Sequence, residues 1–136
     1  MTTSTPKWHL PQATSDTQFS AEHLLGLHAH VYFEAATEAV AEALREKTIA
    51  KYAGRDVEVY GMIRTPAGPH PVGMFKIEFS REMFADVVLW LERERGDLSV
   101  LVHVLSGDEY YDHTQGALWL GPQQSLRLSF LKKRSE

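Results

Sequence analysis

Two histidines, His28 and His30, are separated by a single residue in the stretch HAHVYF, which starts at residue 28. Because side chains of a β-strand alternate between its two faces, His28, His30 and Tyr32 are predicted to share one face, and the apolar residues between them the other. The apolar face suits a protein core. The opposite face carries two imidazoles and a phenol, and imidazoles bind metals and transfer protons.

A third histidine, His103, lies in an apolar stretch at residues 98–105 that also reads as a strand. If this strand runs antiparallel beside the first, His103 comes next to His28 and faces the same side. An H-x-H pair and a histidine on a neighbouring strand can bind a divalent metal from one side and leave positions open for substrate. His28, His30 and His103 are therefore the predicted metal ligands.

Two further histidines are expected to reach the same cavity from loops. His70 lies in the rigid stretch GPHP, and His113 lies in DEYYDHT. The strand register places His70 nearer to Tyr32 than to His28. An imidazole titrates in the range that acid–base catalysis requires. His70 and His113 are therefore the predicted catalytic acid–base residues, and Tyr32 is predicted to bind the substrate.

Ordinary explanations exist for each of these residues taken alone. A single histidine in a strand is usually a surface residue or a hydrogen-bonding partner, and one H-x-H pair is a weak indication of a metal. The number of histidines favours a functional site, because five of them surround one predicted sheet face. Which three of them bind the metal, and whether the carboxylate of Glu78 joins, stays open at this point. His9 and His23 lie outside the set and receive no role.

The elements that must position these residues follow from hydrophobic periodicity. Strands are predicted at residues 27–33, 56–63, 74–79 and 98–105, and helices at about 34–52 and 80–95. The first helix is expected to bury Ala36, Val40, Ala43 and Leu44, and the second Met83, Phe84, Val87, Val88 and Leu91. A polar loop and one or two short strand-like pieces should follow. This order predicts an α+β, ferredoxin-like βαββαβ sandwich. Its antiparallel sheet has the order 4-1-3-2, with both helices on one face and the histidine face open.

Composition narrows the class of protein. The 136 residues are 43% hydrophobic and 24% charged, which fits one globular domain at residues 21–136 after a flexible segment at 1–20. A net charge of −4 without a basic stripe argues against nucleic acid as a partner. No cysteine is present, so thiolate metal sites are excluded. The sequence has no membrane-spanning or signal-peptide pattern, and we expect a cytoplasmic protein.

Several motifs together resemble the DOPA 4,5-dioxygenase family over roughly residues 23–131. They are HAHVYF, GPHPVGMF, LSVLVH, SGDEYYDHTQGALWLG and LRLSFL. The resemblance implies an extradiol ring-cleaving dioxygenase that uses non-haem Fe(II) and O₂ on a catechol substrate, with Zn as a stand-in metal in purified samples. The family's histidines correspond to His28, His30, His70, His103 and His113. This chain departs from the family at Val104-Leu105, where a proline turn is expected, and at Leu27, where an aromatic is common.

Two rival functions stay open. A cofactor-free monooxygenase of the dimeric α+β barrel kind would use the same sheet face without a metal. A non-enzymatic metal- or ligand-binding module would hold a metal without turnover. We also expect a homodimer, because the predicted open face carries Tyr60, Met62 and Met74 and the C-terminal apolar segments exceed what one small sheet needs.

Overall fold

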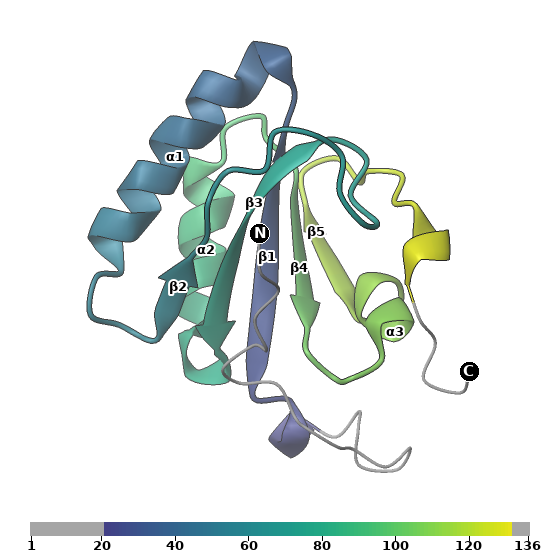
Figure 1. Cartoon of the computed structure of the whole chain (residues 1–136). Helices are drawn as coiled ribbons and strands as arrows, with labels where there is room; N and C mark the ends of the chain where they lie inside the picture. Colours follow the sequence, from purple (N-terminus) through teal and green to yellow (C-terminus); the bar gives the residue numbers. More distant parts are fainter. Residues whose placement is uncertain (1–20, 132–136) are drawn as a thin grey trace.

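The computed structural model describes residues 21–131, and the segment predicted to be flexible, residues 1–20, lies outside this range (Figure 1). The α-helices are α1 (Glu38–Lys51), α2 (Phe84–Glu94) and α3 (Glu109–His113). The strands are β1 (Gly26–Phe33), β2 (Val57–Val59), β3 (Gly73–Ser80), β4 (Val100–Val104) and β5 (Ala117–Leu120). No helix in this part of the chain is long and apolar enough to cross a membrane.

The five strands form one sheet with the order β2-β3-β1-β4-β5, and every neighbouring pair is antiparallel. Helices α1 and α2 lie together on one face, while α3 lies on the opposite side of the sheet (Figure 1). The ferredoxin-like α+β fold is therefore confirmed, with β5 added beside β4. β1 occupies the centre of the sheet, so its side chains have strands on both sides.

The main hydrophobic core lies between the sheet and the two long helices. Strand alternation accounts for its strand residues, because β1, β3 and β4 each contribute every second side chain to this face. The contributions are Leu27, Ala29, Val31 and Phe33 from β1, Phe75, Ile77 and Phe79 from β3, and Val100 and Val102 from β4. The same alternation turns the histidines of β1 and β4 to the opposite face, as predicted.

The buried stripe of α1 differs from the predicted one. Ala41, Leu44 and Thr48 are buried, whereas Val40 is 55% exposed, and Ala36 and Ala43 are also exposed. A 3₁₀ turn at Ala35–Thr37 precedes the helix. Within the helix, Ala41, Leu44 and Thr48 recur at i, i+3 and i+7, which is also a helical face, and it shares only Leu44 with the predicted one. In α2 the core side chains include Val87 and Leu91 as predicted, but Phe84 is 40% exposed.

Two other elements also differ from the expectation. The second strand is only three residues long, and the chain beyond it meets β3 again through a hydrogen bond from Tyr60 to Lys76 and a bridge between Ile63 and Met74. The stretch DEYYDH forms the short helix α3 in place of a loop. Of the strand-like pieces expected near the C-terminus, one is β5 and the other, Leu128–Phe130, is a 3₁₀ turn.

The histidine face of the sheet is covered, which corrects the expectation that it is open. We call residues 61–72 the proline loop and residues 121–131 the C-terminal segment. A second hydrophobic cluster on this face contains buried Tyr32, Met74 and Leu101. Ile63 and Val72 of the proline loop, Trp119 of β5 and Leu126 of the C-terminal segment pack against it. The covering segments leave a cavity over the histidines.

Candidate metal centre and active site

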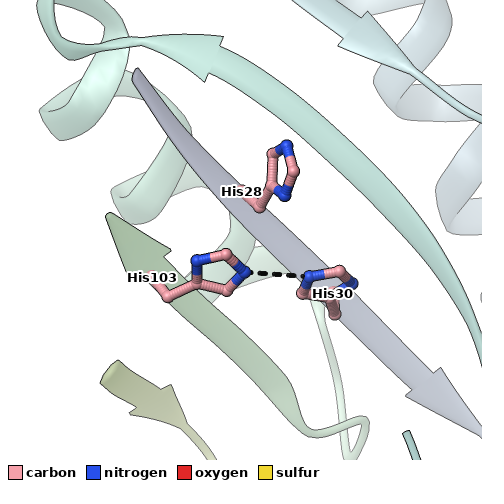
Figure 2. A group of neighbouring side chains, drawn as sticks. All are labelled: His28, His30 and His103. Carbon is pink, nitrogen blue, oxygen red and sulfur yellow. Dashed lines mark hydrogen bonds between the residues drawn. The ribbon is translucent and has the colours of Figure 1, made fainter. Parts of the chain in front are cut away.

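Three buried histidines meet on the inner strands of the sheet. His28 and His30 come from β1, and His103 comes from β4, where it is the register partner of His28. Figure 2 shows the three rings gathered on one side of these strands, with His103 directed at His30. One ligand atom from each of the three rings lies within 4.8 Å of the others. The predicted register is therefore observed, and the predicted ligands lie within reach of one ion.

The donor atoms suit a divalent transition metal. Nδ1–H of His103 donates to the carbonyl of Val104 at 2.8 Å, so the lone pair of its Nε2 faces His30. The two Nε2 atoms are 3.1 Å apart. Two nitrogens that each bind one ion at about 2.1 Å would be roughly 3 to 3.4 Å apart. Nδ1 of His30 is buried without a hydrogen-bond partner in the described part of the chain.

Glu78 supports the centre from outside. It is the register partner of His28 on β3, and its Oε1 accepts a hydrogen bond from Nε2 of His28 at 2.9 Å. Only 1% of Glu78 is exposed. Glu78 belongs to neither potential metal-binding group in the described chain. A carboxylate that accepts from a ligand histidine fixes its ring and tautomer, and here it leaves Nδ1 of His28 as the ligand atom.

A tight turn brings His70 over the same face. Ala67 and His70 exchange backbone hydrogen bonds of 3.3 and 2.9 Å around Gly68-Pro69, and Gly68 has a positive φ of 53°. The C-terminal segment holds the turn, because the backbone N–H of Arg127 donates to Pro69 and its guanidinium donates to Gly68. His70 thereby reaches Tyr32, whose hydroxyl is 2.7 Å from Nδ1 of the ring. His70 thus lies near Tyr32, as predicted.

Helix α3 positions His113. Asp108 caps the helix by accepting from the backbone N–H of Tyr111 at 3.0 Å. The buried carboxylate of Asp112 accepts from the backbone N–H and from the hydroxyl of Ser106. These bonds tie the helix to the end of β4. Nδ1–H of His113 donates to the carbonyl of Glu109 at 2.7 Å, which leaves Nε2 with a free lone pair.

All five histidines surround one centre. A second group of ligand atoms within 4.8 Å of one another comes from His30, His70 and His113, so His30 belongs to both groups. The ring centroids of His30 and His70 are 4.2 Å apart, and those of His103 and His113 are 4.3 Å apart. The structure therefore brings together every histidine that the sequence singled out for the site.

Burial keeps these imidazoles neutral. Desolvation is the main cause that lowers the pKa of all five, and for His30, His70 and His103 the neighbouring histidines lower the pKa further. The pKa of His70 falls to about 3, and the pKa values of His30 and His103 lie well below the usual value. Burial raises the pKa of Tyr32, so its hydroxyl stays protonated. Neutral imidazoles are the form that binds a metal.

A cavity of about 460 Å³ lies over the histidines. Its apolar wall includes Met74, Leu105 and Leu131, and its charged residues include Lys76 and Glu109. Tyr32 does not line this cavity and contacts it through His70, so its predicted substrate contact stays a prediction. Sequence reasoning identified neither Lys76 as a residue of the cavity wall nor the bonds between Ser106 and Asp112 that hold α3. The Asp108 cap before a short polar stretch was a readable signal for α3.

Comparison with known proteins gives one consistent result. The sequence model of the Dopa 4,5-dioxygenase family matches residues 27–130. A curated relative named DOPA 4,5-dioxygenase, from Amanita muscaria, is 37% identical over 115 residues, which is 80% of this chain and 50% of that protein. An uncharacterized 21.2 kDa protein of Botryotinia fuckeliana is 41% identical over 86 residues, or 57% of this chain and 47% of the relative. The chain spans about half the length of these curated relatives.

A solved structure shares the fold. It is the crystal structure of a candidate dioxygenase from Nostoc punctiforme, and its TM-score to this chain is 0.73. The two sequences are 39% identical, and the match covers 79% of this chain and 90% of the other.

Proposed function

The chain belongs to the Dopa 4,5-dioxygenase family, and from this premise we propose that it is an extradiol ring-cleaving dioxygenase that opens a catechol with O₂ at a histidine-ligated Fe(II). The observation that carries the proposal is the approach of the Nε2 atoms of His30 and His103 to 3.1 Å. Without a metal the two rings share a hydrogen bond, in which Nε2–H of His30 donates to Nε2 of His103. The same spacing of the two nitrogens suits a shared ion once the His30 proton has left.

We assign His28, His30 and His103 as the ligands. All three project from the inner strands of a packed sheet, which hold side chains more precisely than loops do. Fe(II) bound there would let a catechol and O₂ meet side by side on its open positions and would pass electron density between them. Zn or another divalent metal would suit the same nitrogens in a purified sample.

His70 and His113 have complementary proton states. Nδ1–H of His113 is engaged by the Glu109 carbonyl, so its Nε2 can accept a proton from a catechol hydroxyl. Tyr32 keeps its proton because burial raises its pKa, so its hydroxyl donates to Nδ1 of His70. His70 then carries its own proton on Nε2, where a neutral imidazole can donate a hydrogen bond to a substrate oxygen. We therefore propose His113 as the acid–base residue, which takes a catechol proton and later returns it, and His70 as a hydrogen-bond donor that orients the substrate.

The covered face gives the reaction a cavity with an apolar wall. Side chains of Met74, Leu105 and Leu131 line the cavity beside the histidines. A substrate bound there would displace water, which would strengthen the hydrogen bonds of His70 and His113 and protect reactive species from side reactions. Tyr32 acts behind His70 in this proposal and orients that ring.

The proposal is tested by loading the protein with Fe(II) without oxygen, then adding air and a panel of catechols. We expect bound iron, O₂ uptake and a yellow ring-fission product. Iron without turnover would instead support a metal-binding module, and turnover without metal would support the cofactor-free monooxygenase.

Five alanine variants test the individual roles. His28→Ala, His30→Ala and His103→Ala should abolish turnover and weaken metal retention by ~10-fold or more. His113→Ala should keep the iron and lower the rate by roughly 10²- to 10⁴-fold, the usual contribution of a general acid or base. His70→Ala should also keep the iron and lower the rate, because the substrate loses a hydrogen-bond donor. Five variants that all keep iron and activity would refute the site.

We also propose a homodimer. Part of the original reason changes, because Met74 is buried within the chain. The remaining reason is β5, which forms an edge of the sheet and carries Leu118 with 43% exposure. Light scattering that gives the 15.4 kDa chain mass across micromolar concentrations would contradict the dimer.

A further inference from the structure

A second cavity, of about 720 Å³, adjoins the cavity over the histidines. His113 lines both cavities, so the two meet at that side chain. Helix α3 and the C-terminal segment lie beside β5 on the histidine side of the sheet (Figure 1). Residues of β5, of the C-terminal end of α3 and of the C-terminal segment line the second cavity. A molecule held over the histidines can therefore extend past His113 into this space.

The polar side chains of the second cavity are uncharged. The sequence contains no Asn, and all three Gln of the described part of the chain line this cavity: Gln115, Gln123 and Gln124. Thr114 and Ser125 add hydroxyls, whereas no Asp, Glu, Lys or Arg is among the described lining residues. The histidine cavity differs, because its wall includes Lys76 and Glu109. We call the second cavity the amide cavity.

These groups favour an uncharged ligand that is rich in hydroxyls. A carboxamide both donates and accepts hydrogen bonds, as a hydroxyl does, so the two groups can pair in either direction. The side chains of Gln115 and Gln123 are exposed and make no hydrogen bond within the described part of the chain. A charged ligand would find no ionic partner, because the cation of this segment, Arg127, already donates to the carbonyl of Gly68.

The indole of Trp119 adds a flat apolar surface to the amide cavity. Trp119 is the register partner of Leu101 and stacks on Tyr32, with ring centroids 5.9 Å apart and an interplanar angle of 24°. This contact fixes the orientation of the indole. A binding site usually combines such an aromatic surface with a few polar groups that orient the ligand. A sugar suits this pair of features, because its C–H face packs on the ring while its hydroxyls bond to the carboxamides.

We propose that the amide cavity binds a glycosyl group carried by the substrate, and that the substrates are catechols with an uncharged sugar on a side chain of the ring. The identity of the ring rests on the proposed function, whereas the sugar subsite is a property of the amide cavity and is tested separately. A sugar in that position leaves both catechol hydroxyls free for the metal and for His113. Gln115, Gln123 and Trp119 are in this view specificity-determining residues and transfer no proton.

The test compares two uncharged probes that differ only in the sugar, hydroxytyrosol and its β-D-glucoside on the side-chain oxygen. Their dissociation constants are measured by calorimetry without oxygen on protein supplied with Fe(II), and their KM and kcat values in air. The glucoside should bind about 10-fold more tightly than hydroxytyrosol, through a few added neutral hydrogen bonds. Gln115→Ala and Gln123→Ala should each raise Kd and KM for the glucoside roughly 3- to 10-fold, and those for hydroxytyrosol less than ~2-fold.

A matched pair of serines makes the test specific. Ser125→Ala removes a hydroxyl from the amide cavity, whereas Ser129→Ala removes one from the same segment outside the cavity, and both serines are exposed. Only Ser125→Ala should weaken binding of the glucoside. The two exposed glutamines can be replaced without disturbing the core, and circular dichroism checks that every variant is folded.

The outcomes separate the two proposals. Equal affinity for the two probes, or equal losses for both in Gln115→Ala and Gln123→Ala, would overturn the sugar subsite even if the protein cleaves catechols. Equal effects of the two serine variants would also overturn it. Tighter binding of the glucoside that depends on both glutamines, in a protein that cleaves neither probe, would support the subsite and refute the dioxygenase.

Discussion

Glu78 and His28 form a buried hydrogen-bonded pair across two adjacent strands, with 2.9 Å between Oε1 and Nε2. The pair is formed by register partners of β3 and β1, so the backbone ladder itself holds the carboxylate against the imidazole. His28 therefore has one nitrogen committed to the protein and the other available to an ion.

The first prediction concerns this carboxylate. Glu78→Gln keeps the size and an acceptor oxygen but removes the charge that makes His28 a better ligand. Metal affinity should fall roughly 10- to 100-fold, the usual effect of losing an outer-shell partner. Competition with a chelating dye measures it. Unchanged affinity would mean that His28 does not bind through its other nitrogen. Glu94→Gln, on α2, serves as the charge-matched control.

The second prediction concerns Tyr32. Tyr32→Phe removes the hydroxyl that contacts Nδ1 of His70 and retains the ring that stacks on Trp119, with centroids 5.9 Å apart. The protein should fold and keep its metal, while kcat drops about 10-fold, in line with one lost hydrogen bond. The same change in a His70→Ala background should have no further effect on kcat. An additive loss in the double variant would show that Tyr32 acts independently of His70, for example on the substrate.

The third prediction is a loss of stability in acid for the metal-free protein. The folded-state pKa values of the five clustered histidines lie below that of an unfolded histidine, so the unfolded chain binds more protons as the pH falls. Their contribution to stability is complete above pH ~6.5 and decreases below it. Below that pH, each histidine that stays neutral in the folded protein lowers the free energy of unfolding by about 1.4 kcal/mol per pH unit.

One buried carboxyl acts in the opposite direction. Burial raises the pKa of Asp112 to about 7, so its contribution to stability increases as the pH falls from 7 toward 4. As the pH falls, the stability lost through the five histidines exceeds the stability gained through Asp112, so the free energy of unfolding decreases. Urea unfolding of chelator-treated protein at pH 7.5, 6.5 and 5.5 measures it. His113→Asn should give a shallower dependence, and a flat profile for the wild-type protein would contradict the expectation.

The fourth prediction tests the packing of the strand pair that carries Tyr32. A Cβ added at Gly73 would lie 2.7 Å from the ring of Phe33, its register partner on β1. Gly73→Ala should therefore reduce the free energy of unfolding by about 1–3 kcal/mol, as overpacking of a core does. Gly61→Ala is the matched control, because nothing lies within 4 Å of its added Cβ. Equal stabilities for the two variants would refute the argument.

The sheet could be predicted from the sequence because its rules are local. Alternation along residues 27–33 separates core side chains from histidines whatever the rest of the chain does. The burial of α1 could not be predicted in the same way. Small apolar residues stand on both sides of Leu44, so the sequence pattern does not decide whether Val40 or Ala41 faces the core. The structure buries Ala41 and leaves Val40 exposed, which depends on how the helix packs against the sheet.

The same distinction between local patterns and three-dimensional packing applies to the site. The proximity of His28 and His103 followed from antiparallel pairing, and the structure contains that pair. The approach of His70 depends on the turn around Gly68 and on Arg127, which is 57 residues further along the chain. No local pattern connects those two segments.

The central position of β1 has a consequence for how the chain acquires its metal. His30 and His103 are 73 residues apart in sequence, and β1 pairs with both β3 and β4. Contacts of such long sequence separation form late, because loop closure must come first. The three-histidine set therefore does not exist in a partly folded chain that has not yet docked β4 on β1. Binding of the ion during refolding would therefore mark the docking of β4 on β1. The bound ion would then slow the separation of these two strands during unfolding.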